Sequence, residues 1–257
     1  MDSVGILMFV SASAWHGGRM TTNGGAGHAP GGTTWAGETA VVTCVVAAVL
    51  PLGLLHVNGI GVLDPLERTI SDYVFLTGGY ALLGIAAVAL AVATLVLAGG
   101  LRRAALPDPG PPTALLVSAA AALVLVAAFP THHPGTTPGL VSTVHRAAGG
   151  WVFVVVPLAG WMVARRARST VAWAAAAPTL TWSAGGAGAV SAFFLVSHLP
   201  IVIGGSPGFP LLGGVQRVLY SLVMLVLVAT ARATRLAVER APIPAAVPAA
   251  VELRGAT

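Results

Sequence analysis

The chain alternates long apolar stretches with short connections that hold most of its charge. Six stretches of roughly 17–22 residues consist mainly of Ala, Val, Leu and Gly, at positions 38–57, 78–99, 113–129, 148–164, 179–199 and 211–230. Because a helix rises about 1.5 Å per residue, each stretch is long enough to cross a hydrocarbon core of about 30 Å. Their many small residues would let neighbouring helices approach closely. The pattern therefore predicts an all-α fold, a bundle of about six membrane-spanning helices.

The two ends of the chain do not fit this pattern. Residues 1–37 begin with an apolar piece, 4–15, that is too short to span a membrane, and continue with a Gly- and Thr-rich run. The last part of the chain is rich in Pro and Ala. We expect 1–37 to be a disordered or interfacial leader, 38–232 to be the transmembrane domain, and 233–257 to be a disordered cytoplasmic tail.

Composition agrees with a membrane protein and disfavours other classes. Of the residues, 56% are hydrophobic and 8% are charged, and the mean hydropathy is +0.87, whereas soluble domains have about 25% charged residues. The net charge of +5 would suggest nucleic-acid binding in a soluble protein, yet all basic residues are Arg and most lie just beyond apolar stretches. We therefore expect no nucleic-acid partner. The single Cys44 permits neither an intrachain disulfide nor a Cys-based zinc site.

The arginines predict which connections face the cytoplasm. The connections after the second and fourth stretches, and the C-terminal region, contain Arg102, Arg103, Arg165, Arg166, Arg168, Arg232, Arg235, Arg240 and Arg254. By the positive-inside rule these segments are cytoplasmic, so both termini are expected inside. The three other connections then face outward.

Most histidines and three of the acids fall in the outward connections. They are His56, Asp64, Glu67 and Asp72 in the first, His132, His133 and His145 in the second, and His198 in the third. Groups that are distant in sequence would thus converge on one face of the bundle. We expect any chemistry to take place there.

Within the first outward connection, residues 64–73 form the densest run of charge and hydroxyl groups. Asp64 precedes Pro65 in a pattern typical of a turn or a helix start, because Pro at the first helical position loses no hydrogen bond. Thr69 or Ser71 could cap the segment that follows. The run is therefore expected to hold local structure between the first two spans.

Two interpretations of this run stay open. In one, it is a short interfacial helix in which Glu67, Arg68 and Asp72 pair with each other. In the other, Arg68 holds an anionic head group and Asp72 acts as a partly desolvated acid or base. We expect Arg217, about one turn into the sixth stretch, to pair with Asp72, because a guanidinium at the membrane edge is costly unless it snorkels to the interface or meets a carboxylate.

The second outward connection contains candidate metal ligands. His132 and His133 are adjacent, and His145 follows about 12 residues later. One of them could join His145 and the carboxylate of Asp64 or Asp72 in a two-His, one-carboxylate site. The alternative is that one His caps a helix end and another is solvated. The sequence has no nucleotide loop, nucleophile elbow, zinc-protease motif or haem-attachment motif, so the cofactor expected is either none or a divalent metal.

These observations assign candidate roles to particular residues. The candidates for acid–base catalysis are Asp72, His145, Asp64 and His56. The candidates for substrate binding are Arg68, Ser71, Tyr73, Arg146, Gln216 and Arg217. The candidate metal ligands are His132, His133 and His145.

Several of these motifs resemble a known family, the bacterial membrane proteins called domain of unknown function 998. The resemblance covers about residues 38–232 and is carried by His56, Asp64-Pro65, Arg68-Thr69-Ile70-Ser71-Asp72-Tyr73, Phe129-Pro130-Thr131, His145-Arg146-Ala147-Ala148-Gly149 and Gln216-Arg217. Members commonly have Asp after Phe-Pro-Thr, where this chain has His132, which argues against a carboxylate role at that position.

The resemblance implies a six-helix bundle in the inner membrane of a bacterial cell. It also implies a distant similarity to eukaryotic membrane proteins of the Frag1, DRAM and Sfk1 type, some of which act in lipid remodelling. It supplies no established reaction.

Two functions fit the sequence. The first is an outward-facing polar site for a lipid or isoprenoid-like amphiphile, at which Asp72 and a histidine catalyse acid–base modification or cyclisation. The second is a non-enzymatic lipid-binding, structural or accessory protein whose polar groups close the bundle. In both, the expected partners are membrane lipids or an amphiphilic small molecule. A transporter is disfavoured, because the spans place no charge near the midplane.

Overall fold

The computed structural model describes residues 35–133, 136–204 and 209–240. In these residues all regular secondary structure is helical, in the order α1 (Gly37–Asn58), η1 (Ile70–Phe75), α2 (Gly79–Arg103), α3 (Gly110–Ala128), α4 (Leu140–Ala167), α5 (Val171–Ala174), α6 (Ala177–Gly204) and α7 (Leu212–Arg240). Six of these helices are long and apolar enough to cross a membrane. The predicted all-α bundle of six spans is confirmed, and the protein is a multi-pass integral membrane protein.

Two helices extend well beyond their apolar stretches. α4 begins at Leu140, eight residues before the predicted stretch 148–164, and α7 continues to Arg240. Hydropathy marks only the part of a helix that lies in hydrocarbon, whereas the backbone hydrogen bonds continue into the interface. As a consequence His145 and Arg146 lie on the second turn of α4 and not, as predicted for His145, in the connection before it. Of the predicted leader and tail, residues 1–34 and 241–257 lie outside the described residues.

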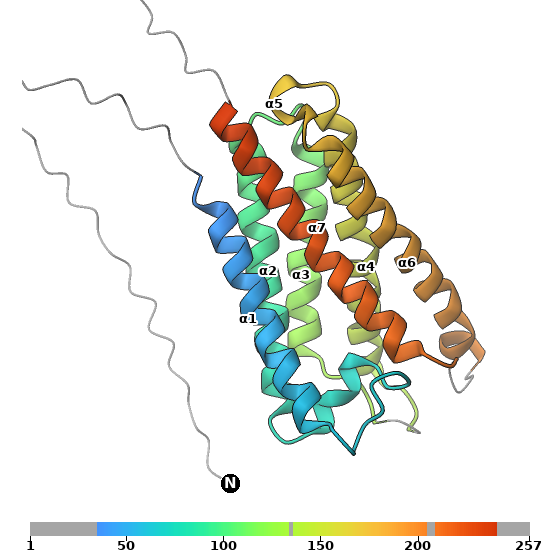
Figure 1. The fold of residues 1–257 in the computed structure, drawn as a ribbon. Coiled ribbons are helices and arrows are strands. Elements are labelled where there is room, and N and C mark those ends of the chain that lie inside the picture. Colours follow the sequence, from blue (N-terminus) through green and yellow to red (C-terminus); the bar gives the residue numbers. More distant parts are fainter. Residues whose placement is uncertain (1–34, 134–135, 205–208, 241–257) are drawn as a thin grey trace, which may run out of the picture. The chain divides into compact units, whose positions relative to one another are not determined.

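Helices that follow one another in sequence pack side by side, and α7 closes the bundle. It contacts α1, α2, α4 and α6, and it crosses the other helices diagonally in Figure 1. α7, the last helix of the described residues, therefore packs against α1, the first.

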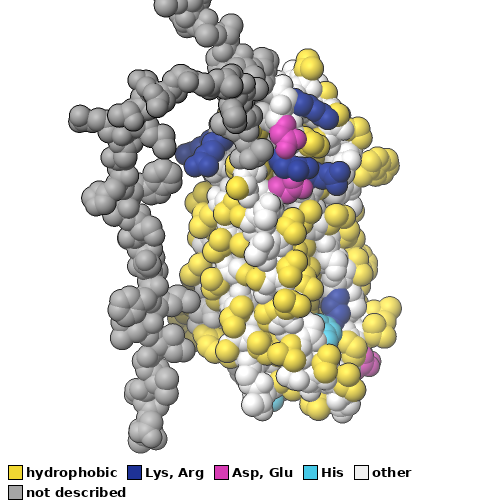
Figure 2. Space-filling model, turned by 60° about the vertical axis from the view of Figure 1, so that its left-hand side comes forward, with side chains coloured by type: hydrophobic (Ala, Val, Ile, Leu, Met, Phe, Trp, Pro, Cys, Tyr) yellow, Lys and Arg dark blue, Asp and Glu magenta, His cyan; other side chains and the backbone are white. Residues whose placement is uncertain are grey.

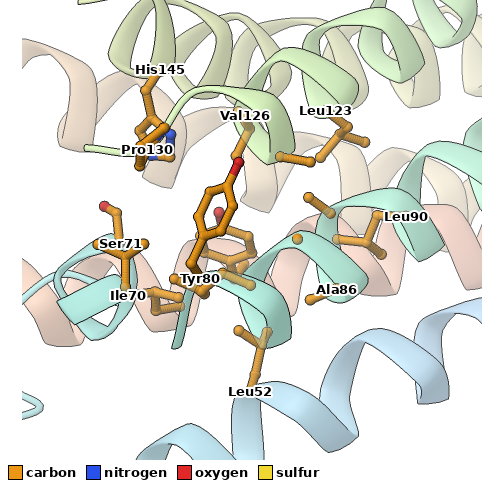
Figure 3. Close-up of a pocket in the computed structure, with 16 residues that line it drawn as sticks. Leu52, Ile70, Ser71, Tyr80, Ala86, Leu90, Leu123, Val126, Pro130 and His145 are labelled. Carbon is orange, nitrogen blue, oxygen red and sulfur yellow. The ribbon is translucent and has the colours of Figure 1, made fainter. Parts of the chain in front are cut away.

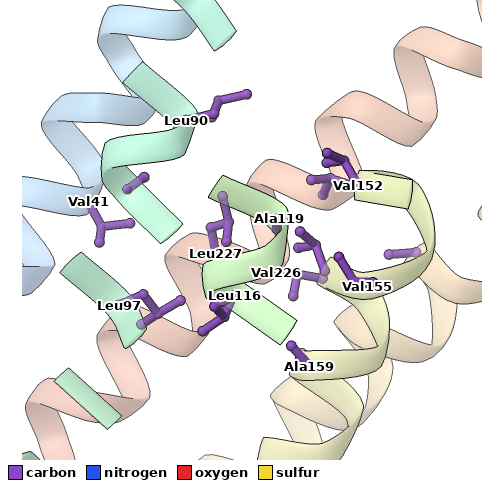
Figure 4. Packing of buried hydrophobic residues seen from close by; sticks show 14 of the residues in the cluster. Val41, Leu90, Leu97, Leu116, Ala119, Val152, Val155, Ala159, Val226 and Leu227 are labelled. Atoms are coloured by element: carbon purple, nitrogen blue, oxygen red, sulfur yellow. The ribbon is translucent and has the colours of Figure 1, made fainter. Parts of the chain in front are cut away.

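The core between the helices consists of small and medium-sized apolar side chains. Leu97, Leu116, Val155 and Val226 come together from four different helices (Figure 4). α4 and α7 approach closely at Gly160, where a methyl group would lie 2.7 Å from Cγ1 of Val226. The predicted role of small residues in close helix packing is therefore visible between α4 and α7.

The bundle has two chemically different ends. One end is formed by the α2–α3 and α4–α6 connections and by the last turns of α7, and we call it the arginine end. It contains ion pairs. Arg166 lies 2.7 Å from Asp108, and Arg235 pairs with Glu38. Figure 2 shows arginines and acids gathered at this end and hydrophobic side chains over the middle of the visible face. The opposite end, formed by residues 56–80, 129–133, 136–146, 198–204 and 209–217, contains the predicted site residues and is called the histidine end.

Candidate functional site

A pocket lies inside the bundle at the histidine end, between α1, α2, α3, α4 and α7 and beside η1 (Figure 3). The space that the centres of water molecules could occupy in it is about 50 Å³, and all the empty space between its lining atoms and at its open mouth is about 580 Å³. Most of its lining is aliphatic, and its polar side chains belong to Ser71, Tyr80, His145 and Tyr220. In Figure 3, Ser71 and His145 lie toward one end of the pocket, while Leu90 and Leu123 lie toward the other. The pocket thus has a polar end and an apolar end.

Tyr80 stands where this pocket meets the surface. Its hydroxyl donates to the carbonyl oxygen of Ala128 at 3.2 Å, which joins the start of α2 to the end of α3. A second, more open hollow shares three lining residues with the pocket, and its full lining is Val74, Phe75, Tyr80, Pro130 and Thr131. The shared residues indicate that the pocket continues outward past Tyr80.

Arg217, on the second turn of α7, makes the densest set of hydrogen bonds at the histidine end. Its Nε donates to Nε2 of His56 at 2.7 Å, and its Nη2 donates to the hydroxyl of Tyr73 at 3.1 Å. Its Nη1 donates to the carbonyl oxygens of Arg68 at 2.8 Å and of Gly213 at 2.9 Å. All three guanidinium nitrogens are therefore engaged, and every acceptor is uncharged.

The contacts of His56 define its protonation state. Its Nδ1 lies 2.7 Å from the carbonyl oxygen of Leu52, which can only accept, so Nδ1 carries the hydrogen. Nε2 then has the free lone pair that accepts from Arg217. The ring also stacks on Tyr73 at a centroid distance of 4.9 Å. His56 is thus a neutral imidazole with both nitrogens occupied.

The start of α7 also holds the segment before α2 through its backbone. The side-chain oxygen of the buried Gln216 accepts from the amide of Ile70 at 2.7 Å, and the amide of Gly214 donates to the carbonyl of Leu66 at 3.0 Å. At Gly213 a Cβ atom would lie 2.1 Å from the carbonyl oxygen of Arg68. Glycine is therefore required at Gly213 for this close approach. We call Arg217, His56, Tyr73, Gln216 and Gly213 the brace.

The two candidate acids bind nearby backbone amides. Oδ2 of Asp72 accepts from the amide of Thr69 at 2.9 Å in a capping box at the start of η1. Oδ1 of Asp64 accepts from the amide of Leu66 at 2.8 Å. The predicted turn at Asp64 and the predicted cap at Thr69 are confirmed.

The predicted ion pair between Asp72 and Arg217 is wrong, and the ion pairs of the first interpretation of residues 64–73 are not formed among the described residues. Asp72 does not pair with Arg217, and among the described residues Glu67 and Arg68 form no ion pair with each other or with Asp72. The Asp72 carboxylate binds an amide three residues earlier, and Arg217 is satisfied by carbonyl, hydroxyl and imidazole acceptors. Arg68 enters the network only through its backbone carbonyl, and its side chain is exposed.

A second arginine–histidine pair lies at the same end. Nη2 of Arg146 is 3.0 Å from Nε2 of His132 and 3.3 Å from its Nδ1. A guanidinium has no acceptor, so His132 accepts and is neutral. Burial, together with the positive charge of Arg146, lowers the pKa of His132 below its ordinary value, while the Asp72 carboxylate acts in the opposite direction. In the described part of the chain, His132 is the only hydrogen-bond partner of the Arg146 side chain.

The three candidate metal ligands are engaged separately. Nδ1 of His145 bonds to the carbonyl oxygen of Phe129 at 2.7 Å, and the ring of His133 packs on Phe75 at a centroid distance of 4.1 Å. His132 accepts from Arg146 instead. The described residues contain no group of three or more His, Cys, Asp or Glu side chains that could share a metal ion.

Apart from Arg68, Arg146, His132 and His133, the candidate residues divide into three sets. His145 and Ser71 line the pocket; His56, Tyr73, Gln216 and Arg217 belong to the brace; Asp64 and Asp72 hold backbone turns. Sequence reasoning missed the lining residues Tyr80 and Tyr220. Each is the only tyrosine of its helix, and that was the signal available.

Comparison with known proteins identifies a family for this chain. No curated protein and no solved structure is detectably similar to it. A family model described as protein of unknown function (DUF998) matches residues 41–233, which cover all six spans except the first turn of α1 and the end of α7. The protein is therefore a member of the DUF998 family.

Proposed function

We propose that the protein binds a lipid or isoprenoid-like amphiphile, with the hydrocarbon chain in the pocket and the head group at the histidine end. The observation that carries the proposal is the polarity of the pocket. Leu90 and Leu123 lie toward one end, and Ser71 and His145 toward the other (Figure 3). A ligand with an apolar chain and one polar group matches that gradient.

The open hollow beside Tyr80 supports access from the bilayer. It lies between the start of α2 and the connection after α3, at the end of the spans. Phe75 and Tyr80 are 41% and 49% exposed there, as is typical of aromatic side chains at a membrane interface. An amphiphile in the bilayer would meet this opening with its head group already at interfacial depth.

Contacts at the histidine end favour binding over catalysis. The side chains of Asp64, Asp72 and His56 are bound to the protein's own backbone or to Arg217, and none of them lines the pocket. In the described residues the pocket lining contains no carboxyl group, so the geometry offers no acid to start an isoprenoid cyclisation. We therefore propose lipid binding as the function.

Acid–base modification of the bound amphiphile is the second candidate, and it rests on His145. Because Nδ1 of His145 donates to the Phe129 carbonyl, its Nε2 carries a lone pair that can accept a proton from a ligand hydroxyl. His145 lines the pocket at its polar end. An enzyme of this kind would lose product formation, but keep ligand binding, when His145 is replaced by Gln.

The distribution of arginine supports an orientation in the membrane. The arginine end carries the basic residues of the α2–α3 and α4–α6 connections and of α7. By the positive-inside rule this end faces the cytoplasm, both termini are cytoplasmic, and the histidine end faces outward from a bacterial inner membrane. The proposed ligand would then come from the outer leaflet of that membrane.

Filling the pocket tests the proposed function. Gly84 lines the pocket, and a Cβ added there meets no atom within 4 Å, so Gly84→Leu adds a large side chain at the pocket lining without a backbone clash. Gly99, on the exposed face farther along α2, has equally open space and provides a matched Gly99→Leu control.

Mass spectrometry of lipids that co-purify with the protein in mild detergent provides the measurement. We expect a specific amphiphile in the wild-type protein and in Gly99→Leu, and its loss from Gly84→Leu. Identical lipid profiles in all three proteins, at normal yield, would contradict the proposal.

A further inference from the structure

We infer that the amphiphile carries an anionic head group, a phosphate or a carboxylate, and that this group binds Arg146. The inference rests on the proposed function, because it assigns a head group to a chain held in the pocket. It concerns one cationic side chain at the polar end of that pocket.

The position of Arg146 favours this role. Arg146 itself lines neither the pocket nor the open hollow, but it follows the pocket residue His145 on α4. Its side chain contacts His132, which follows Thr131 in the lining of the hollow. A head group that leaves the polar end of the pocket along this segment would meet the guanidinium.

The hydrogen bonding of Arg146 leaves donors for a ligand. A guanidinium offers five N–H donors, and in the described residues only Nη2 of Arg146 has a partner, the neutral His132. Its side chain is only partly exposed, and no carboxylate pairs with it among the described residues. A partly buried and unpaired guanidinium is stabilised by an anion that accepts two parallel hydrogen bonds.

The neighbouring titratable groups do not replace such an anion. Asp72 is bound to the amide of Thr69, and His145 donates to a backbone carbonyl. On α6, His198 lies within electrostatic reach of Arg146. Its Nδ1 is buried without a hydrogen-bond partner in the described part of the chain. That atom is a second group that an oxygen of the head group could satisfy.

Other arginines at this end do not offer the same site. The three guanidinium nitrogens of Arg217 all donate to acceptors of the protein. The side chain of Arg68 is exposed, whereas that of Arg146 is partly buried. Arg146 is thus the cation that the geometry assigns to the ligand, and Arg68 is a control with the same charge.

The test compares three probes with the same chain and different head groups. Hexadecyl phosphate, palmitate and hexadecanol are bound to the full-length protein in phosphatidylcholine nanodiscs, and binding to empty nanodiscs is subtracted. The proteins compared are the wild type, Arg146→Gln, Arg68→Gln and Gly84→Leu. A preference for phosphate over carboxylate, or the reverse, identifies which of the two anions the site takes.

We expect the wild type to bind at least one anionic probe about tenfold or more tightly than hexadecanol, as is typical of hydrogen bonds to a charged group. Arg146→Gln should reduce this preference to less than about threefold, whereas Arg68→Gln should keep it. Gly84→Leu should weaken the binding of all three probes.

The outcomes separate this inference from the proposed function. Equal binding of the three probes to the wild type, with all of them weakened by Gly84→Leu, would overturn the anionic head group and leave the pocket intact. Equal loss of preference in Arg68→Gln and Arg146→Gln would also overturn it, because diffuse surface charge would explain the selectivity. Binding that is insensitive to Gly84→Leu would overturn the proposed function itself.

Discussion

Two arginines at the histidine end donate to neutral histidines, yet their surroundings differ. Arg217 donates from all three guanidinium nitrogens to His56, Tyr73 and two backbone carbonyls. Arg146 has one partner in the described residues, His132. The first pair connects α1, η1 and α7, whereas the second connects α4 to the connection before it.

This difference shows how an arginine at a membrane edge can serve structure or recognition. Arg217 needs no carboxylate, because carbonyl, hydroxyl and imidazole dipoles surround its charge, and the Tyr73 ring lies 5.4 Å from its guanidinium carbon. A saturated arginine of this kind holds helices together. An arginine with unused donors beside a pocket can bind a ligand. Mutations that separate stability from binding therefore test the comparison directly.

Loss of Arg217 is expected to have the largest effect on stability. Arg217→Gln would leave the Tyr73 hydroxyl, the His56 ring and the Arg68 carbonyl without their charged donor, so the free energy of unfolding should fall by about 3 kcal/mol. Arg146→Gln should lower it by no more than about 1 kcal/mol. Thermal unfolding of the purified proteins in one detergent would measure both changes.

Arg217→Lys provides the control for charge alone. Lysine keeps the positive charge but cannot donate in four directions, so it should recover only part of the lost stability. The distinction between the two pairs would fail if Arg217→Gln and Arg146→Gln were equally destabilising.

Gly213→Ala is expected to cause a smaller loss of stability than Arg217→Gln. The new methyl group would lie 2.1 Å from the Arg68 carbonyl oxygen, which accepts a hydrogen bond from Arg217. The brace would therefore have to shift, and the free energy of unfolding should fall by about 2 kcal/mol. In Gly214→Ala the methyl group would meet Cδ2 of Leu66 at 3.4 Å, an ordinary contact. Unfolding midpoints of these neighbouring variants should therefore differ clearly. Equal midpoints would show that the close approach of α7 to residues 64–68 contributes little to stability.

The sequence predicts the spans well, because hydropathy and length are local properties that the bilayer imposes on each segment. All six predicted spans are present. It predicts helix ends less well, since the additional turns of α4 and α7 lie outside the hydrocarbon and carry no apolar signal. The first turns of α4 matter most, because they place His145 and Arg146 on a rigid helix beside the pocket.

The sequence predicts which residues lie at the polar end of the bundle, but it does not predict their hydrogen-bond partners. Asp72 and Arg217 are chemically suited to each other, yet Asp72 binds a backbone amide, and Arg217 donates to two backbone carbonyls as well as to His56 and Tyr73. Residue type therefore gives no indication of these partners. The pocket is equally difficult to predict, because Gly84 and Leu90 are ordinary residues whose common cavity depends on how five helices are arranged.

The smallest expected effect is a pH dependence of stability that arises from the contact between Arg146 and His132. Burial and the charge of Arg146 lower the pKa of His132, so the folded protein binds a proton less readily there than the unfolded chain does. At about pH 7.5 His132 is neutral in both states and contributes nothing. As the pH falls through about 6.5, the unfolded chain takes up the proton first, so stability is lost down to the lowered pKa of the folded state.

His132→Asn removes this titration and keeps a neutral acceptor for Arg146. Between about pH 7.5 and pH 5.5, the wild type should therefore lose more stability than His132→Asn. His56, His145 and His198 are present in both proteins, so their contributions cancel in the comparison. Unfolding midpoints at the two pH values provide the measurement. If both proteins lost the same stability, Arg146 would not disfavour protonation of His132, and the proposed attraction of Arg146 for an anion would lose its electrostatic basis.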